Sequence, residues 1–214
     1  MQHNEWAQGS RGPVIYLAAG DLQEAAAVFD LLCRETPLPF RLAAFAATDW
    51  NRELSPWPAP PVFGKEGFAG QADVTLRWLR EEYIPLVEEE PAQARLIGGY
   101  SLGGLFSLWA FYESGLFRGA AGCSASLWFP GWQDYVQQKS APQGALYLSL
   151  GKREPFTRNQ AMQSVGAVME WQREYALRQG LRATLVWHEG GHFQEPERRI
   201  ALGLKWLLEA CYSS

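Results

Sequence analysis

Short apolar runs alternate with helix-like stretches along most of this chain of 214 residues, and no internal repeat or linker interrupts them. Uninterrupted apolar runs are typical of strands buried on both faces, and an intervening helix allows successive strands to lie parallel in one sheet. The runs fall at residues 14–19, 40–47, 94–97, 119–124, 145–150 and 181–188. The chain is therefore predicted to fold as a single α/β domain, with a parallel sheet of about six strands and helices on both faces.

Two segments lie outside this alternation. Residues 1–12 are polar, which predicts an N-terminal tail before a domain at residues 13–214. Residues 48–70 are rich in proline, tryptophan and glycine, and they exceed the usual connection of about 4–6 residues. Because long loops in compact domains are commonly functional, we expect this loop to lie over an active site.

Composition narrows the class of protein. Hydrophobic residues make up 47% and charged residues 20% of the sequence, as in a globular protein, and the net charge of −4 provides no basic surface for a nucleic acid. No apolar run approaches the roughly 20 residues of a membrane-spanning helix, and the N-terminus has no apolar export signal. Three widely separated cysteines (Cys33, Cys123 and Cys211) favour reduced thiols, so we expect a cytoplasmic protein.

One predicted strand-to-helix junction carries a serine between glycines. The run at 94–97 leads into Gly98-Gly99-Tyr100-Ser101-Leu102-Gly103, and an amphipathic stretch follows. The pattern G-x-S-x-G in this context forms a sharp turn, in which a side chain at Gly99 or Gly103 would clash with neighbouring backbone. The turn exposes the hydroxyl at the carboxyl end of a strand, beside a helix N-terminus. We therefore predict Ser101 as a nucleophile; the alternative is a glycine-rich turn with a surface serine.

A serine hydroxyl needs a base to accept its proton, and imidazole is the usual base. Of the three histidines, His3 lies in the predicted tail and His188 ends the last predicted strand. His192 follows two glycines in a loop after that strand, where the backbone is flexible enough for the ring to reach Ser101. We predict His192 as the base, with His188 as the alternative.

A carboxylate is expected to orient the imidazole. The chain order serine, acid, histidine places this acid between the other two residues. Glu154 is favoured because it follows the strand at 145–150, near the edge where the other strands end. Asp134 and Glu189 are alternatives, on a predicted surface helix and on the histidine loop itself. The competing interpretation of Glu154 is a solvated loop residue paired with a basic neighbour.

Two backbone N–H groups are expected to form an oxyanion hole. The first is that of Leu102, directly after the nucleophile, and the second comes from the loop after the first strand, where we favour Asp21. Gly20 permits the turn in that loop. The carboxylate of Asp21 must point away from the oxyanion, because it would repel the developing negative charge.

The string His188-Glu189-Gly190-Gly191-His192 also matches the zinc-protease pattern H-E-x-x-H. That chemistry needs both histidines on one face of a helix. Here the string follows a strand-like run, and each of the two glycines would cost a helix about 1 kcal/mol relative to alanine. We therefore predict a loop at this position, and neither a metal nor an organic cofactor.

At four places in the same order, the sequence resembles the esterase D and enterobactin-esterase branch of the α/β-hydrolases, and the likeness extends from Pro13 to Leu208. Residues 48–56 (T-D-W-N-R-E-L-S-P) resemble the T-D-R-x-R-D-x-T-P loop of that branch. Residues 82–85 (E-Y-I-P) resemble its E-L-I-P helix, and residues 124–129 (S-A-S-L-W-F) resemble its S-P-S-L-W-W segment. The serine turn is the fourth place.

The resemblance implies an α/β-hydrolase fold in which Ser101 is the nucleophile, His192 the base and Glu154 the residue at the acid position. The sequence starts just before what would be the third strand of the full eight-stranded fold. A trimmed sheet of about six strands, without the first β-hairpin, is therefore implied. Some members of the branch function with a Ser–His pair and a weak acid or none, which leaves the role of Glu154 open.

Two departures from the branch concern the substrate. Tyr100 replaces the histidine usual before the nucleophile, and Trp50 replaces the first arginine of the loop, which removes a cation that would bind an anionic substrate. With Trp128, these residues are expected to line an apolar, aromatic pocket. We predict a serine hydrolase that cleaves small-molecule carboxylic esters or thioesters through an acyl-enzyme on Ser101. The alternatives are acyl transfer by the same groups, as in the related mycolyltransferases, and a non-catalytic binding protein.

Overall fold

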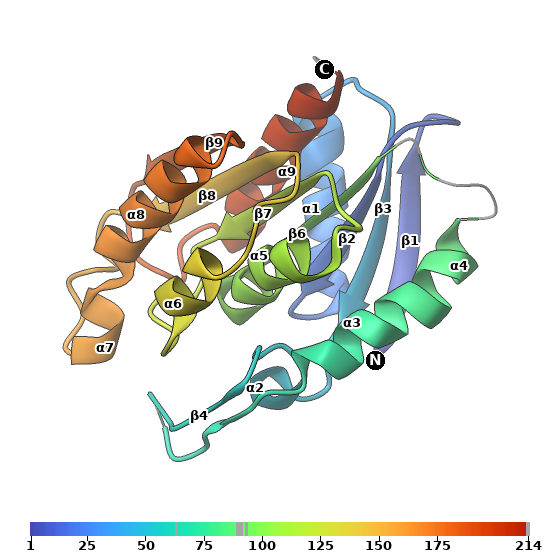
Figure 1. Cartoon of the computed structure of the whole chain (residues 1–214). Coiled ribbons are helices and arrows are strands. Elements are labelled where there is room, and N and C mark those ends of the chain that lie inside the picture. The colour runs from blue at the N-terminus through green and yellow to red at the C-terminus, as the bar shows by residue number, and fades with distance from the viewer. Residues whose placement is uncertain (63, 89–91, 93, 213–214) are drawn as a thin grey trace.

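The computed structural model describes residues 1–62, 64–88, 92 and 94–212. Seven strands form one sheet in the order β1-β3-β2-β6-β7-β8-β9 (Figure 1). The strands β2 to β9 of this sheet are parallel, and β1 pairs antiparallel with β3 at one edge. The bounds are β1 (Gln2–Gln8), β2 (Val14–Ala19), β3 (Phe40–Ala46), β6 (Arg95–Tyr100), β7 (Gly119–Cys123), β8 (Ala145–Gly151) and β9 (Arg182–His188). The predicted α/β fold is confirmed, with one strand more than expected.

The additional strand, β1, corrects the predicted N-terminal tail. Its residues pair along the whole of β3, from Gln2 opposite Ala46 to Gln8 opposite Phe40. An edge strand needs only backbone N–H and C=O groups to pair, so a polar sequence forms it without an apolar run. Its side chains add two anchors, because the amide of Gln8 donates to backbone carbonyls after the first helix and Trp6 stacks near Phe29.

Helices cover both faces of the sheet (Figure 1). Successive side chains of β2 point to opposite faces of the sheet, and both faces are apolar. Ile15 and Leu17 join the apolar cluster under one set of helices, while Tyr16 joins the cluster under the other. One face is covered by α1 (Leu22–Glu35) and α9 (Pro196–Tyr212). The other face is covered by α3 (Ala72–Trp78), α5 (Ser101–Ser114) and α8 (Val165–Arg178). The apolar runs that form β2, β3, β6, β7 and β8 are therefore buried on two sides, as predicted, whereas β9 lies at the edge of the sheet and is half-buried.

The helical stretch that follows the long loop, for which the sequence pattern predicts one helix over residues 71–90, is divided in the structure. A π-helical turn, Leu79–Tyr83, separates α3 from α4 (Ile84–Val87), and Pro85 is the second residue of α4. Proline has no N–H to donate, and wide turns of this kind accommodate a break in the helical hydrogen-bond ladder. The predicted end at residue 90 lies outside the described residues.

The long loop at residues 48–70 contains one short helix and two short strands. These are α2 (Trp50–Glu53), β4 (Pro58–Ala59) and β5 (Phe68–Ala69), with β4 and β5 paired antiparallel.

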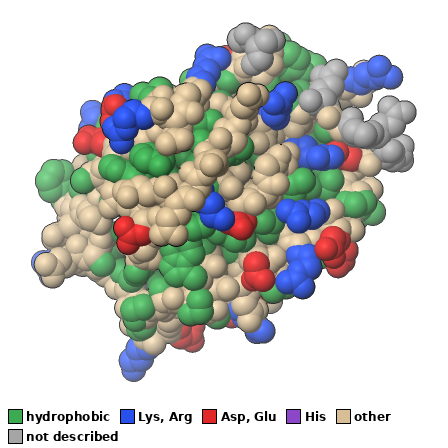
Figure 2. Space-filling model, in the orientation of Figure 1, with side chains coloured by type: hydrophobic (Ala, Val, Ile, Leu, Met, Phe, Trp, Pro, Cys, Tyr) green, Lys and Arg blue, Asp and Glu red, His purple; other side chains and the backbone are tan. Residues whose placement is uncertain are grey.

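Two further short helices are α6 (Trp132–Gln137) and α7 (Gln160–Gln163). No helix in the described part of the chain is long and apolar enough to cross a membrane. Figure 2 shows acidic and basic side chains interspersed over one face of the molecule.

Candidate active site

Ser101 lies at a strained turn between β6 and α5. Its φ angle is +53°, in the left-handed region that a side chain usually avoids. The turn is tight enough that a Cβ on Gly99 would lie 2.5 Å from the carbonyl carbon of Gly103, and a Cβ on Gly103 would lie 2.8 Å from the oxygen of Ala18. The prediction that both glycines are required by neighbouring backbone is confirmed. Strain of this kind holds a side chain in a position that an ordinary turn would not provide.

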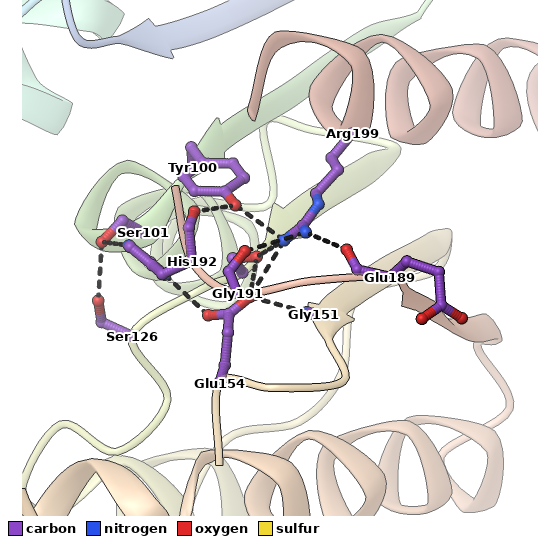
Figure 3. Close-up of polar contacts among 10 residues, drawn as sticks. Tyr100, Ser101, Ser126, Gly151, Glu154, Glu189, Gly191, His192 and Arg199 are labelled. Atoms are coloured by element: carbon purple, nitrogen blue, oxygen red, sulfur yellow. Dashed lines mark hydrogen bonds and ion pairs between the residues drawn. The ribbon is translucent and has the colours of Figure 1, made fainter. Parts of the chain in front are cut away.

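Three side chains that follow different strands meet at this turn (Figure 3). Nε2 of His192, in the loop after β9, lies 3.1 Å from Oγ of Ser101. Nδ1 of the same ring lies 2.7 Å from Oε2 of Glu154, in the turn after β8. Because the strands are parallel, their carboxyl ends meet at one edge of the sheet, and the predicted serine, histidine and glutamate are brought into one chain of contacts.

The carboxylate of Glu154 is mostly buried, and both of its oxygens form hydrogen bonds. Its Oε1 accepts hydrogen bonds from Oγ of Ser124 and from the N–H of Gly151, both at 2.7 Å, while Oε2 faces His192. Burial by itself raises the pKa of this carboxyl group, but the hydrogen bonds from His192, Ser124 and Gly151 outweigh it and hold the pKa below its usual range. Glu154 is therefore an ionised partner of the imidazole, and not the solvated loop residue of the competing interpretation.

Arg199, which was not predicted as a site residue, also belongs to this cluster. The side chain extends from α9 into the space behind the histidine loop and forms an ion pair with Oε1 of Glu154 at 3.2 Å (Figure 3). A sequence signal for it exists, since Arg199 stands four residues before Gly203 and eight before Leu207, both of which are buried. An arginine on the apolar face of a helix needs a buried partner.

Tyr100 lies beside the histidine loop, and its hydroxyl bonds to two residues there. It is 7% exposed, and its hydroxyl donates to the backbone oxygen of His192 at 2.7 Å and accepts a hydrogen bond from Arg199 at 3.1 Å. Burial raises the pKa of Tyr100 to about 12, so the hydroxyl remains a donor at neutral pH. The structure thus commits this hydroxyl to the histidine loop, and substrate contact by Tyr100 remains a prediction.

The turn after β7 supports both ends of the cluster. The N–H of Ser126 donates to the backbone oxygen of Ser101 at 3.0 Å, and Oγ of Ser124 donates to Glu154. Ser124 itself has a φ angle of +43°, so this turn is strained in the same way as the serine turn. The segment that resembled S-P-S-L-W-W therefore connects the nucleophile to the acid.

The two predicted oxyanion donors lie at the ends of neighbouring strands. Ala18 of β2 pairs with Gly99 of β6, so Asp21 and Leu102 follow these strands side by side. The N–H of Leu102 belongs to the first turn of α5, where a helix leaves its N–H groups without an intrahelical acceptor. The carboxylate of Asp21 accepts hydrogen bonds from the N–H groups of Gln23 and Glu24, both at 2.8 Å, and so caps α1.

The predicted aromatic residues lie near this edge. The ring of Trp50 approaches both glycine turns, because a Cβ on Gly20 or Gly103 would lie 3.8 or 3.6 Å from it. Trp128 follows Ser126 by two residues and packs near Phe68. Two phenylalanines that were not selected from the sequence are strongly exposed beside the candidate triad: Phe193, 93% exposed, with its ring edge-to-face against His192, and Phe156, 86% exposed, two residues after Glu154.

The zinc-protease string does not form a helix. His188 is the last residue of β9, and Gly190 has a φ angle of +85° in the loop that follows, so the two histidines do not share a helical face. Among the described residues, no group of three or more His, Cys, Asp or Glu side chains is arranged to hold a metal ion. The alternative base is also unsupported, since it is His192 that contacts Ser101.

No protein-family model matches the sequence, and neither does any curated protein. Solved structures are similar in fold. The siderophore hydrolase EstA from Aspergillus nidulans is 17% identical, with a TM-score of 0.73 over 97% of this chain and 94% of that one. An IroE-like serine hydrolase from Shewanella oneidensis is 16% identical, with a TM-score of 0.77 over 97% of this chain and 80% of that one. The enterobactin esterase FES from Shigella flexneri is 19% identical, with a TM-score of 0.68 over 97% and 55%. At these identities the likeness shows the shared α/β-hydrolase fold, as the sequence resemblance implied.

Proposed function

We propose that this protein is a serine hydrolase that cleaves carboxylic esters or thioesters through an acyl-enzyme on Ser101. The observation that carries the proposal is the unbroken chain of contacts from Oγ of Ser101 through the ring of His192 to the ionised carboxylate of Glu154. Nucleophile, base and orienting acid within hydrogen-bonding distance are the arrangement that acyl transfer to serine requires. The fold shared with solved serine hydrolases and esterases supports the same conclusion.

The reaction follows from the roles of these three groups. Oγ of Ser101 attacks the carbonyl carbon while its proton passes to Nε2 of His192. The oxygen of the tetrahedral intermediate accepts hydrogen bonds from the N–H groups of Leu102 and Asp21, and Glu154 stabilises the imidazolium without taking its proton. His192 then protonates the leaving alcohol or thiol, and an acyl ester remains on Ser101.

Water completes the cycle. His192 accepts a proton from the water molecule as its oxygen attacks the acyl carbon, and then returns the proton to Oγ of Ser101 as the carboxylic acid leaves. An alcohol in place of water would give acyl transfer instead of hydrolysis. No step requires a metal or an organic cofactor.

The residues around the site favour an apolar or aromatic part in the substrate. Trp50 lies beside the glycine turns, the exposed ring of Phe193 packs against His192, and the exposed Phe156 follows the acid by two residues. Burial of an exposed phenylalanine against substrate releases ordered water and contributes binding energy, on the order of 2 kcal/mol for a fully covered ring. The neighbours named as siderophore hydrolases make a siderophore ester the rival substrate class.

The cellular location of the enzyme is part of the same proposal. All three cysteines of the described chain are free, and Cys123 is fully buried. Unpaired cysteines are typical of a reducing compartment, which supports a cytoplasmic location. The net charge of −4 favours a small-molecule partner over a nucleic acid.

Hydrolysis of short-chain and aryl nitrophenyl esters by the native protein, beside Ser101→Ala, tests the proposal. Ser114→Ala is a matched control, because Ser114 ends α5 and its hydroxyl bonds to the backbone of Ala110 and Leu116, away from the candidate triad. We expect turnover by the native protein and the control, and a loss of several powers of ten in Ser101→Ala. Activity that survives in Ser101→Ala would remove the serine from its role. Product partition with an added alcohol distinguishes hydrolysis from acyl transfer.

A further inference from the structure

We propose that Arg199 is the positioning residue that holds the acid and the histidine loop of this site in register with each other. The inference rests on the proposed function, and it concerns a residue that does not touch the reacting atoms. Arg199 is 2% exposed, and it comes from the last helix, whereas the groups that it binds lie at or just after the ends of four different strands.

The guanidinium divides its donors between the two arms of the site. Nη1 donates to Oε1 of Glu154 at 3.2 Å, to Oγ of Ser124 at 3.2 Å and to the hydroxyl of Tyr100 at 3.1 Å. Nη2 donates to the backbone oxygens of Glu189 at 2.9 Å and Gly191 at 3.0 Å. One planar group therefore binds the acid on one side and the backbone of the histidine loop on the other.

These contacts determine which oxygen of the acid faces the imidazole. Because Oε1 of Glu154 is occupied by Arg199, Ser124 and Gly151, Oε2 is the oxygen available to Nδ1 of His192. The hydroxyl of Tyr100 extends the arrangement, since it accepts from Arg199 and donates to the backbone oxygen of His192. The guanidinium of Arg199 thereby fixes the positions of both the Glu154 carboxylate and the His192 ring.

A lysine could not make the same set of contacts. Guanidinium presents five N–H donors in a rigid planar fork, whereas an ammonium is a compact charge on a flexible stem. The loop that Arg199 holds contains Gly190 at a φ angle of +85° and Gly191 beside it, so its backbone has few constraints of its own. The ion pair with Glu154 compensates the burial of the charge.

The test compares Arg199→Met and Arg199→Lys with Arg198→Met. Arg198 is the adjacent residue on the same helix, and its exposed guanidinium pairs with Glu195 instead of the candidate triad, so it is a matched control. Each variant is checked for folding by circular dichroism. The first readout is the rate at which Ser101 is labelled by a fluorophosphonate, which reports the activated serine whatever the natural substrate is. The second is the pH dependence of kcat/KM for a nitrophenyl ester.

We expect labelling and kcat to fall about 10²-fold in Arg199→Met, because a misplacement of about 1 Å in a catalytic group has this effect. Arg199→Lys should fall about tenfold, and Arg198→Met should match the native protein. The acid limb of the pH profile should move to higher pH in Arg199→Met, since loss of the positive charge 3.2 Å from Glu154 makes that carboxylate easier to protonate.

The contributions of other titratable groups near the guanidinium have to be distinguished from this shift of the acid limb. Those that interact electrostatically with Arg199, besides the catalytic pair, are Tyr100, Cys123, Tyr147 and His188. Burial raises the pKa values of the tyrosines and the cysteine, which removes them from the acid limb. His188→Gln, measured in the native and Arg199→Met backgrounds, removes the remaining group and should leave the shift in place.

The proposal is overturned if Arg199→Met folds, labels at the native rate and keeps the native acid limb. It is also overturned if Arg198→Met loses as much labelling rate and kcat as Arg199→Met. If Arg199→Met does not fold, the decision passes to Arg199→Lys, in which native rate and profile would overturn it. If the native protein labels but hydrolyses no ester, the proposed hydrolysis fails while slower labelling in Arg199→Met still supports the positioning role. If Ser101 of the native protein does not label, both proposals fail.

Discussion

The backbone N–H of Ser126 donates a hydrogen bond to the carbonyl oxygen of Ser101, and the hydroxyl oxygens of the two serines lie 3.4 Å apart. This contact joins the turn after β7 to the strained turn after β6. A left-handed backbone at a residue other than glycine costs on the order of 1–3 kcal/mol and persists only where the surroundings hold it in place. Ser126, Gly99 and Gly103 are the surroundings that do so here.

The strain at Ser101 predicts a difference between two inactive variants. Ser101→Ala retains the side-chain carbon that disfavours a φ angle of +53°, whereas Ser101→Gly removes it. We expect both variants to lose activity and the glycine variant to be more stable than the alanine variant by roughly 1 kcal/mol, after the larger entropy of unfolded glycine is taken into account. Urea unfolding followed by circular dichroism measures the difference. A glycine variant less stable than the alanine variant would contradict strain at this residue.

The tight turn predicts a large effect of one methyl group. In Gly99→Ala the new Cβ would meet backbone atoms of Gly103 at 2.5 and 2.6 Å, and backbone cannot move aside as a flexible side chain can. We expect a loss of about 3 kcal/mol, at the upper end of the usual range for overpacking. Gly191→Ala is the stability control, because its Cβ would meet no atom within 4 Å. Equal unfolding midpoints for the two variants would show that the turn is looser than described.

Glu154→Gln tests whether the site needs its acid. A glutamine keeps the shape but cannot stabilise the imidazolium, and it can hold the ring in the wrong tautomer. We expect kcat to fall by up to ~10⁴-fold, the size of the effect in well-studied triads. Steady-state kinetics with a nitrophenyl ester gives the value. A change of less than about tenfold would instead favour a Ser–His pair, the alternative that the family resemblance leaves open.

The same residue predicts how stability depends on pH. The pKa of Glu154 in the folded protein lies below the ordinary value of 4.5 for glutamate, because hydrogen bonds to the ionised form outweigh burial. The ionised group therefore stabilises the fold fully above about pH 4.5, and this contribution is lost as the pH falls below 4.5 through the folded-state pKa. Unfolding midpoints measured across this window should fall more steeply for the native protein than for Glu154→Gln. Parallel curves would mean that the carboxyl group titrates as it does in the unfolded chain.

Removal of residues 1–8 tests the correction at the N-terminus. Without β1, the edge of β3 is left unpaired and the ring of Trp6 no longer covers Phe29. We expect a lower thermal midpoint and association of the shortened chain through the exposed edge, which size-exclusion chromatography would detect. A shortened chain as stable and as monodisperse as the full one would show that β1 contributes little to the fold.

Local signals in the sequence were enough to predict the sheet and the three groups of the candidate triad. A buried parallel strand requires an apolar run, so β2 appears at residues 14–19 as predicted, and a helix that begins at Pro196 follows from the fixed φ of proline. Gly99 is dictated by the backbone of Gly103, four residues away, although the contact that constrains Gly103 is with Ala18 of the neighbouring strand. Parallel strands then bring residues that follow their ends, among them Glu154 and His192, to one edge.

Tertiary structure alone decided the features whose partners are distant or bind through backbone. Strand β1 pairs by N–H and C=O groups that every residue type carries, so its polar sequence contained no sign of it. Arg199 and Tyr100 are 99 positions apart in the chain, and no local pattern shows that they bond to each other or to the histidine loop. Such contacts depend on where α9 packs against the sheet, and the packing is determined by the whole apolar core, not by the residues that make the contacts.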